Sequence, residues 1–197
     1  EIANSPELRA AFRKCIEFKL DKHWKNNQRG FMSFGLVQLG QVAASLGEGD
    51  LAHHCLKHLV NRFWLNNLAS MHNHRSLFNM DISGGMPAVI IKMLVSSQPG
   101  QIQLLPALPS DWPTGTIEGV LCRGQVEVKR LHWNQDRIEI GLISGKKQSI
   151  ILEVPKAIEE ISVTYGKARL KKTGQNNSRR IALPLDQEIV CAIKLNA

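Results

Sequence analysis

The chain has little that would bind a metal, cross a membrane or hold a nucleotide. Its four cysteines are scattered, and no two form the CxxC pair typical of zinc sites. There is no run of about 18 or more apolar residues, which excludes a transmembrane helix. The phosphate-binding loop, the Rossmann fingerprint, the serine-hydrolase elbow and the zinc-protease helix motif are all absent. The sequence therefore predicts no cofactor, no metal and no membrane span.

Positive charge is in excess, with a formal net charge of +8. Residues 1–99 carry 11 cationic and 7 acidic side chains, and residues 100–197 carry 14 and 10, so each half has a net charge of +4. The densest cations are Lys171–Lys172 and Arg179–Arg180, and no aromatic residues alternate with them as single-stranded nucleic acids would favour. We expect a solvated basic hairpin there and no nucleic-acid partner.

Apolar residues recur at helical spacing before residue 100 and predict helices at 5–28, 31–46, 51–65 and 85–97. Glycines 35 and 40 within the second helix cost about 1 kcal/mol each relative to alanine. They predict that another helix packs closely there. Paired helices of this length with short links are typical of helical-hairpin arrays or toroids. The third helix has the clearest apolar stripe, which consists of Ala52, Cys55, Leu56, Leu59, Val60 and Phe63.

Two histidines of the third helix suggest a metal site. His54 and His58 are four residues apart and share a helical face, as zinc ligands on helices do. No acidic residue lies between them, so the motif is not HExxH, and the spacing offers no third ligand. We expect them to be ordinary helix histidines, exposed or partly buried.

One carboxylate, Asp81, lies where the helical part of the sequence meets its last helix. The polar stretch before it, residues 65–80, has no clear period, and a loop this long is usually functional or mobile. Asp81 precedes Ser83-Gly84-Gly85 and the apolar helix at 85–97, which we expect to be buried on most sides. Asp81 is therefore the candidate catalytic residue. The alternative is that Asp81 only caps this helix, where its negative charge also interacts favourably with the helix dipole.

After Gly100 the apolar period changes from about 3.6 to about 2 residues, which predicts strands. Turns rich in Gly, Pro and Asn separate these short strands, which is typical of an antiparallel sandwich. We expect helices in residues 1–100, a connector with several prolines and Trp112 at 101–116, and a β-domain at 117–197, which together make an α+β fold. The strands are predicted at 101–105, 117–122, 126–133, 137–143, 149–154, 160–165, 168–172 and 188–195.

Residues 103–133, QLLPALPSDWPTGTIEGVLCRGQVEVKRLHW, resemble glycoside hydrolase family 95, the α-L-fucosidases and α-L-galactoside-active enzymes. Weaker similarity extends over residues 30–145. The segment Phe78–Gly85 is similar to the family's Phe-Gln-Ile-Asp-Gly-Asn-x-Gly motif through Phe78, Asp81 and Gly85, with Ile82-Ser83 in place of Gly-Asn. In the longer block, Gln125 replaces a family glycine, and the matching positions are Leu104 to Pro109, Trp112, Gly115, Gly119, Arg123, Gly124 and Trp133.

The resemblance implies the last helices of an (α/α)6 toroid followed by a small antiparallel β-sandwich domain. It also implies an inverting glycoside hydrolase in which Asp81 helps to activate water, as the second carboxyl group does in that mechanism. The general-acid glutamate and the water-holding asparagines would lie in an N-terminal part of the same protein, so we expect this fragment alone to be inactive.

The expected partners are an oligosaccharide or polysaccharide substrate and that missing N-terminal part, in a secreted or periplasmic protein. Two alternatives remain. One is a non-catalytic carbohydrate-binding or structural module. The other is a different (α/α)6 enzyme, such as a disaccharide phosphorylase.

Overall fold

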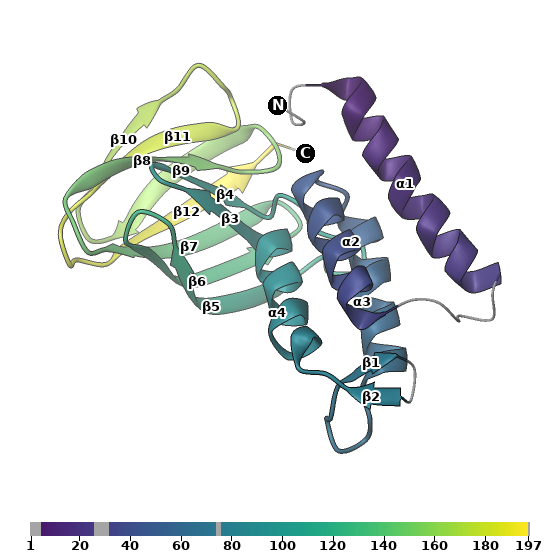
Figure 1. Ribbon diagram of the computed structural model, residues 1–197. Coiled ribbons are helices and arrows are strands. Elements are labelled where there is room, and N and C mark those ends of the chain that lie inside the picture. Colours follow the sequence, from purple (N-terminus) through teal and green to yellow (C-terminus); the bar gives the residue numbers. More distant parts are fainter. Residues whose placement is uncertain (1–4, 26–31, 74–75, 197) are drawn as a thin grey trace. The chain divides into compact units, whose positions relative to one another are not determined.

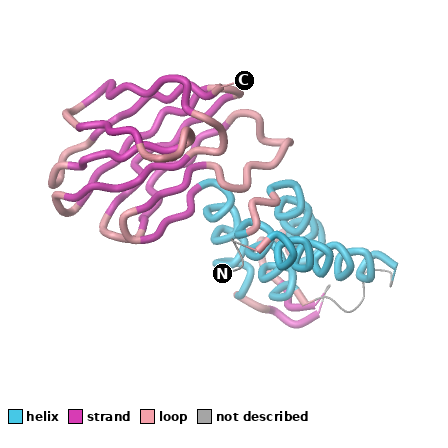
Figure 2. The backbone as a smooth tube through the Cα atoms, turned by 90° about the horizontal axis from the view of Figure 1, so that it is seen from above, coloured by secondary structure: helices cyan, strands magenta, loops and turns pink. Residues whose placement is uncertain are grey.

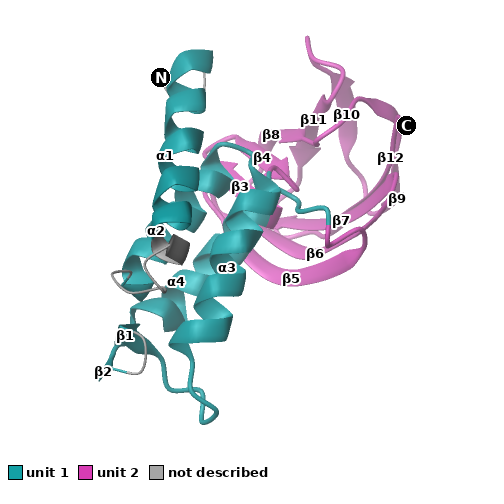
Figure 3. Ribbon diagram, turned by 90° about the vertical axis from the view of Figure 1, so that its right-hand side faces the viewer, with its two compact units in different colours: residues 1–93, 107–110 teal, residues 94–106, 111–197 magenta. Residues whose placement is uncertain are grey.

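The computed structural model describes residues 5–25, 32–73 and 76–196, and the chain divides into two compact units (Figure 3). Unit 1 comprises residues 1–93 and 107–110, and unit 2 comprises residues 94–106 and 111–197. The described helices lie in unit 1 except for Leu94, the last residue of α4, whereas the two larger sheets are built from residues of unit 2 (Figure 2 and Figure 3). The fold is therefore α+β, as the sequence predicts.

The described helices begin and end close to their predicted bounds (Figure 1). Helix α1 starts with an N-cap, because Ser5 Oγ accepts a hydrogen bond from the backbone N–H of Leu8 at 3.3 Å, and Pro6 takes the first helical position. The predicted ends at residues 28 and 31 lie outside the described part of the chain. None of these helices is long and apolar enough to cross a membrane. The bounds are α1 Pro6–Lys25, α2 Ser33–Ser45, α3 Gly49–Phe63 and α4 Asp81–Leu94.

Close packing of α2 against its neighbours confirms the prediction made from Gly40. A Cβ atom at this position would lie 3.1 Å from Val89 Cγ1 of α4 and 3.4 Å from Cys55 Cβ of α3. The apolar stripe of α3 is buried as predicted except for Val60, which is 52% exposed. Gly35 instead faces a groove between α1 and α2.

Helix α4 is not buried on most sides, so that prediction is wrong for the described residues. It buries Ile82, Val89 and Met93, but Ile91 is 39% exposed. The cause is its packing face: Gly85 and Val89 lie against α2, whereas Ile91 lies on a more exposed side of the helix. The helix also ends at Leu94 rather than at 97, because residues 95–98 pair as a strand.

Two five-stranded sheets make up most of unit 2. One has the order β10-β11-β8-β4-β3 and the other β5-β6-β7-β12-β9. Neighbouring strands pair antiparallel except β4 and β8, which are parallel. All eight predicted strands form, and the sequence missed β3 and β11. The strands are β3 Val95–Gln98, β4 Gln101–Leu104, β5 Gly115–Cys122, β6 Val126–Asn134, β7 Arg137–Ser144, β8 Gln148–Glu153, β9 Ile158–Tyr165, β10 Arg169–Lys172, β11 Ser178–Leu183 and β12 Ile189–Leu195.

The core of unit 2 follows from the alternating pattern of its strands. In β12, every second residue from Ile189 to Leu195 is buried, which is the period expected for a sheet with one solvated face. Trp133 of β6 is also buried, and its indole N–H donates a hydrogen bond to the Trp112 carbonyl at 3.0 Å. A Cβ atom on Gly115 would overlap this indole ring. Glycine is therefore required where the Trp112 segment enters the sheet.

Candidate functional site

A short hairpin leads directly to Asp81. Strand β1, Met71–Asn73, pairs antiparallel with β2, Ser76–Phe78, so Met71 lies opposite Phe78. The stretch before Asp81 is thus partly ordered as strands, although its sequence shows no period. Immediately after β2, the Asn79 backbone N–H donates to the Ser70 carbonyl at 2.9 Å, which ties the hairpin to the start of α4.

The side-chain amide of Asn79 is the centre of a small polar network. Its Nδ2 donates to Asp81 Oδ2 at 2.8 Å and lies 2.9 Å from His72 Nδ1, while its Oδ1 accepts the backbone N–H of Asp81. Because Nδ2 has two hydrogens and no lone pair to offer, His72 Nδ1 is the acceptor of the second one. A neutral His72 therefore carries its proton on Nε2.

This network determines how the Asp81 carboxylate is oriented. Asp81 is the first residue of α4 and is exposed to solvent. Its Oδ2 is occupied by Asn79, and no hydrogen bond from the described residues reaches its Oδ1. The carboxylate makes no hydrogen bond to the described backbone amides of α4, so the turn before the helix is closed by Asn79 instead. One carboxylate oxygen of this exposed residue is thus held by Asn79, which leaves Oδ1 to accept a hydrogen bond from a further partner.

Ile82 and Ser83 stand where the family motif has Gly-Asn, and they differ in exposure. Ile82 is fully buried. Ser83 is exposed, but its Oγ lies 3.3 Å from the buried Ser70 Oγ, which in turn donates a hydrogen bond to the Asn79 carbonyl. Ile82 therefore anchors the start of α4 in the core, whereas Ser83 joins the polar network through Ser70.

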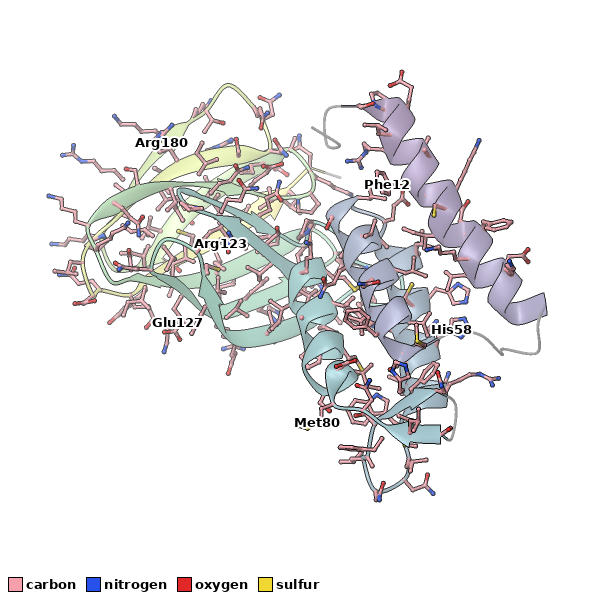
Figure 4. All side chains as sticks on the ribbon, viewed as in Figure 1. Phe12, His58, Met80, Arg123, Glu127 and Arg180 are labelled. Carbon is pink, nitrogen blue, oxygen red and sulfur yellow. The ribbon has the colours of Figure 1, made fainter. Side chains whose placement is uncertain are left out.

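Exposed apolar side chains accompany Asp81. Leu77, Phe78 and Met80 are 65%, 66% and 70% exposed, respectively, and Met80 is labelled at the start of α4 in Figure 4. Leu77 also has a positive φ of 57°, which few residues other than glycine adopt. Exposed apolar groups next to a polar network are typical of a surface that binds a ligand or a partner.

The histidine pair of α3 does not form a metal centre in the described residues. The rings of His54 and His58 stack with their centroids 4.9 Å apart, His54 is exposed and His58 is buried. Among the residues that the structure describes, no group of three His, Cys, Asp or Glu side chains could hold a metal ion. A separate groove of about 520 Å³ between α1 and α2 is lined mainly by Phe12, Ile16, Leu39 and Val42, and Asp81 is not part of it.

Residues 96–188 match the model of a known protein family, described as glycoside hydrolase family 95, C-terminal domain. The match begins after Asp81 and includes the Pro- and Trp-containing segment. A curated relative, alpha-L-fucosidase 2 from Arabidopsis thaliana, is 40% identical over 68 residues. These residues are 34% of this chain and 8% of that protein. The resemblance to family 95 is therefore confirmed for this C-terminal segment.

Two solved structures show only distant likeness. Alpha-L-fucosidase isoenzyme 2 from Paenibacillus thiaminolyticus is 12% identical, with a TM-score of 0.25, over 45% of this chain and 16% of that one. A GH127 beta-L-arabinofuranosidase from Geobacillus stearothermophilus T6 is 8% identical, with a TM-score of 0.39, over 83% of this chain and 31% of that one. Both scores are too low to assign a fold. The chain spans a small part of the length of each relative.

Proposed function

We propose that this chain, whose residues 96–188 match the C-terminal domain of glycoside hydrolase family 95, is the C-terminal part of an inverting glycoside hydrolase. The substrates are α-L-fucosides or related α-L-galactosides in glycans. The observation that carries the proposal is Asp81, which is held by Asn79 at an exposed helix start just before the matched segment. The name of the Arabidopsis relative supports the choice of sugar.

The proposed architecture follows from the same family. Helices α1–α4 are the last helices of an (α/α)6 toroid, and the two five-stranded sheets form a β-sandwich. The tight link Leu46–Glu48 between neighbouring helices α2 and α3 supports the first part, because such toroids are built from helical hairpins. The alternating burial of strands such as β12 supports the second part.

In this proposal Asp81 is the residue that activates water. An inverting enzyme places a carboxylic acid and a carboxylate base about 6.5–9.5 Å apart, on opposite sides of the glycosidic bond, with the water on the side of the base. Asp81 Oδ1 accepts a hydrogen bond from that water, and Asn79 keeps the carboxylate in one orientation through Oδ2. Asn79 is a positioning residue, and the general acid lies in the N-terminal part of the protein. The protein is secreted or periplasmic, where glycans are accessible.

The test uses the full-length protein that contains this chain, with aryl α-L-fucosides and α-L-galactosides as substrates. Replacing a general base lowers kcat by about 10²–10⁴-fold, so Asp81→Asn should lose at least about a hundredfold in kcat with a small change in KM. Asp186→Asn, at an exposed turn of unit 2, is the matched control and should retain full activity. NMR of the first product should show the inverted anomer. Turnover in Asp81→Asn equal to that of the wild type would exclude this role for Asp81.

A second candidate function is a non-catalytic carbohydrate-binding or structural module. The buried side chain of Ile82 and the short hydroxyl of Ser83 favour it, because the family motif has Gly-Asn there and this chain lacks the side-chain amide of that asparagine. Glycan binding by the full-length protein with no release of sugar would support this alternative. Release of sugar only in the presence of phosphate would indicate a phosphorylase instead.

A further inference from the structure

The sheet β5-β6-β7-β12-β9 has a polar hollow on its solvent side. Its volume is about 390 Å³, and all the residues that line it belong to unit 2. Ligand pockets commonly have volumes of about 300–1,000 Å³, so one sugar residue or a disaccharide end fits this size class. We call this site the sheet hollow, and its polar lining consists of His132, Asn134, Arg137, Glu139, Glu160, Ser162 and Lys194.

The hollow lies over two small side chains in the middle of a sheet face. Ala192 of β12 pairs with Glu139 of β7 on one side and with Ser162 of β9 on the other. The side chains of Ala192 and Ser162 are much shorter than those of Glu139 and Lys194 beside them. The intervening residues Ile138 and Ile193 are buried on the opposite face, so the floor of the hollow is anchored in the core of unit 2.

The next row of the sheet supplies the wall. Lys194 pairs with Arg137 on β7 and with Glu160 on β9. The ammonium group of Lys194 donates to Glu159 Oε1 at 2.7 Å, and this bond raises the pKa of the lysine. These contacts hold a flexible side chain at the edge of the hollow.

The lining carries two cations, Arg137 and Lys194, and two carboxylates, Glu139 and Glu160. Their charges are equal in number, and Glu159 adds a further carboxylate on Lys194 at the edge, so an anionic ligand gains no net electrostatic attraction. The groups nevertheless offer both strong donors and strong acceptors within one hollow. His132 adds a ring nitrogen, since its Nδ1 lies 2.9 Å from Thr116 Oγ1 and Nε2 is the other available atom. A ligand that both donates and accepts hydrogen bonds, without carrying charge, suits this lining best.

We propose that the sheet hollow binds a neutral sugar residue of a glycan and acts as a non-catalytic carbohydrate-binding site. Each sugar hydroxyl donates to a carboxylate and accepts from a guanidinium or ammonium group. The choice of a fucosylated ligand rests on the proposed function, but the site lies in unit 2 and does not involve Asp81. Because the hollow is open and the described lining has no aromatic platform, we expect a Kd on the order of millimolar.

The first experiment titrates the ¹⁵N-labelled chain with methyl α-L-fucoside and, separately, with L-galactose. We expect amide shifts confined to β6, β7, β9 and β12, and the same shifts in Asp81→Asn, which separates this site from the proposed catalytic one. Shifts elsewhere, or none at millimolar sugar, would overturn the proposal. A glucuronate that binds more tightly than the neutral sugar would exclude a neutral ligand.

Two substitutions test the site itself. Ala192→Leu fills the hollow, and Glu139→Gln removes a charged acceptor while keeping the side-chain shape. Weakening one hydrogen bond to a charged group costs about tenfold in binding, so Glu139→Gln should raise Kd by about that factor. Ala192→Leu should abolish detectable binding, because its side chain occupies the volume of the sugar. Lys171→Gln, on β10 of the other sheet, is the control and should bind as the wild type does. Dispersed amide spectra verify that each variant folds, and unchanged binding by folded Ala192→Leu would contradict the proposal.

Discussion

At the level of single residues, the orientation of Asp81 depends on the side-chain amide of Asn79. That amide contacts the Asp81 carboxylate, the Asp81 backbone N–H and His72 Nδ1. The family motif has glutamine at the position of Asn79, which bears the same amide on a longer arm. The contact to Asp81 therefore depends on the short side chain of asparagine in this chain, since a longer side chain cannot close the same two-residue turn.

We predict that Asn79→Ala lowers kcat of the full-length protein by about tenfold or more. The variant lacks the hydrogen bond that orients the base, and such a bond contributes on the order of 1 kcal/mol. Asn79→Gln should not recover this loss, since its longer side chain cannot close the same turn. The split between kcat and KM distinguishes orientation from unfolding: Asn79→Ala should lower kcat with little change in KM, while its circular dichroism spectrum matches that of the wild type. Equal activity of the alanine variant and the wild type would show that Asn79 does not position Asp81.

The four thiols should differ in reactivity. Burial raises the pKa of Cys191 to about 11 and that of Cys55 to about 12, whereas Cys15 is exposed. The reactive form is the thiolate, so an alkylating reagent at about pH 8 should modify Cys15 first and reach Cys55 and Cys191 only after unfolding. Mass spectrometry of the alkylated peptides gives the order. Early labelling of Cys191 in the native state would contradict the burial in unit 2.

The same burial predicts how stability depends on pH. An unfolded thiol loses its proton near about pH 8.5, but Cys191 keeps it up to about pH 11. Its contribution to stability is therefore complete below about pH 8.5 and is lost as pH rises toward about 11. The free energy of unfolding, measured with denaturant, should fall over this pH range more steeply for the wild type than for Cys191→Ala. Parallel pH dependences in the two proteins would argue against a buried neutral thiol.

At the level of elements, the contact between α2 and α4 is close enough to require glycine. A Cβ atom on Gly85 would lie 2.8 Å from both methyl carbons of Val37, whereas a Cβ atom on the neighbouring Gly84 would meet nothing within 4 Å. Because both glycines lie in α4, they share a helical backbone conformation. They differ only in what packs against them.

We therefore predict opposite effects for two adjacent substitutions. Gly85→Ala should destabilise unit 1 by about 1–3 kcal/mol through overpacking, and Gly84→Ala should stabilise it by up to about 1 kcal/mol through helix propensity. Urea unfolding measures both values. Adding Val37→Ala to Gly85→Ala should recover part of the loss, because it removes the two methyl carbons. Similar destabilisation by both alanines would mean that α4 does not pack on α2 in this way.

Most elements could be predicted from the sequence, and the exceptions have physical causes. Strand β3 follows α4 without an intervening turn residue, and its identity depends on pairing with β4 across the turn at Gly100, whose φ is +82°. Strand β11 begins with Ser178 and two arginines, which read as a turn. Asp81 is the candidate from sequence because a carboxylate precedes two glycines and an apolar run. Its contacts with Asn79 were not predictable, since they depend on a hairpin whose strands are too short to show a period.

At the level of the whole molecule, the chain passes between its two units three times. After residues 94–106 it returns to unit 1 for residues 107–110 before it continues in unit 2. Asp50 holds this return, because its Oδ1 accepts from the Ser110 N–H at 2.7 Å and from the Ser110 hydroxyl at 2.9 Å. The Ala107 N–H also donates to the Met93 carbonyl at 3.1 Å.

This path determines where the chain can be shortened. Residues 94–197 contain both five-stranded sheets complete, whereas residues 117–197 lack β3 and β4. Residues 117–197 would lack β4, the strand that pairs with β8, so the edge of β8 would be exposed. We predict that residues 94–197 unfold cooperatively, and that residues 117–197 are less stable and tend to aggregate. Thermal unfolding followed by circular dichroism, with light scattering on both proteins, tests this.

Strand β4 buries Ile102 and Leu104 in unit 2. Residues 94–197 with both of these replaced by alanine should therefore approach the lower stability of residues 117–197. If residues 117–197 unfold as cooperatively as residues 94–197, the sheet does not depend on β3 and β4.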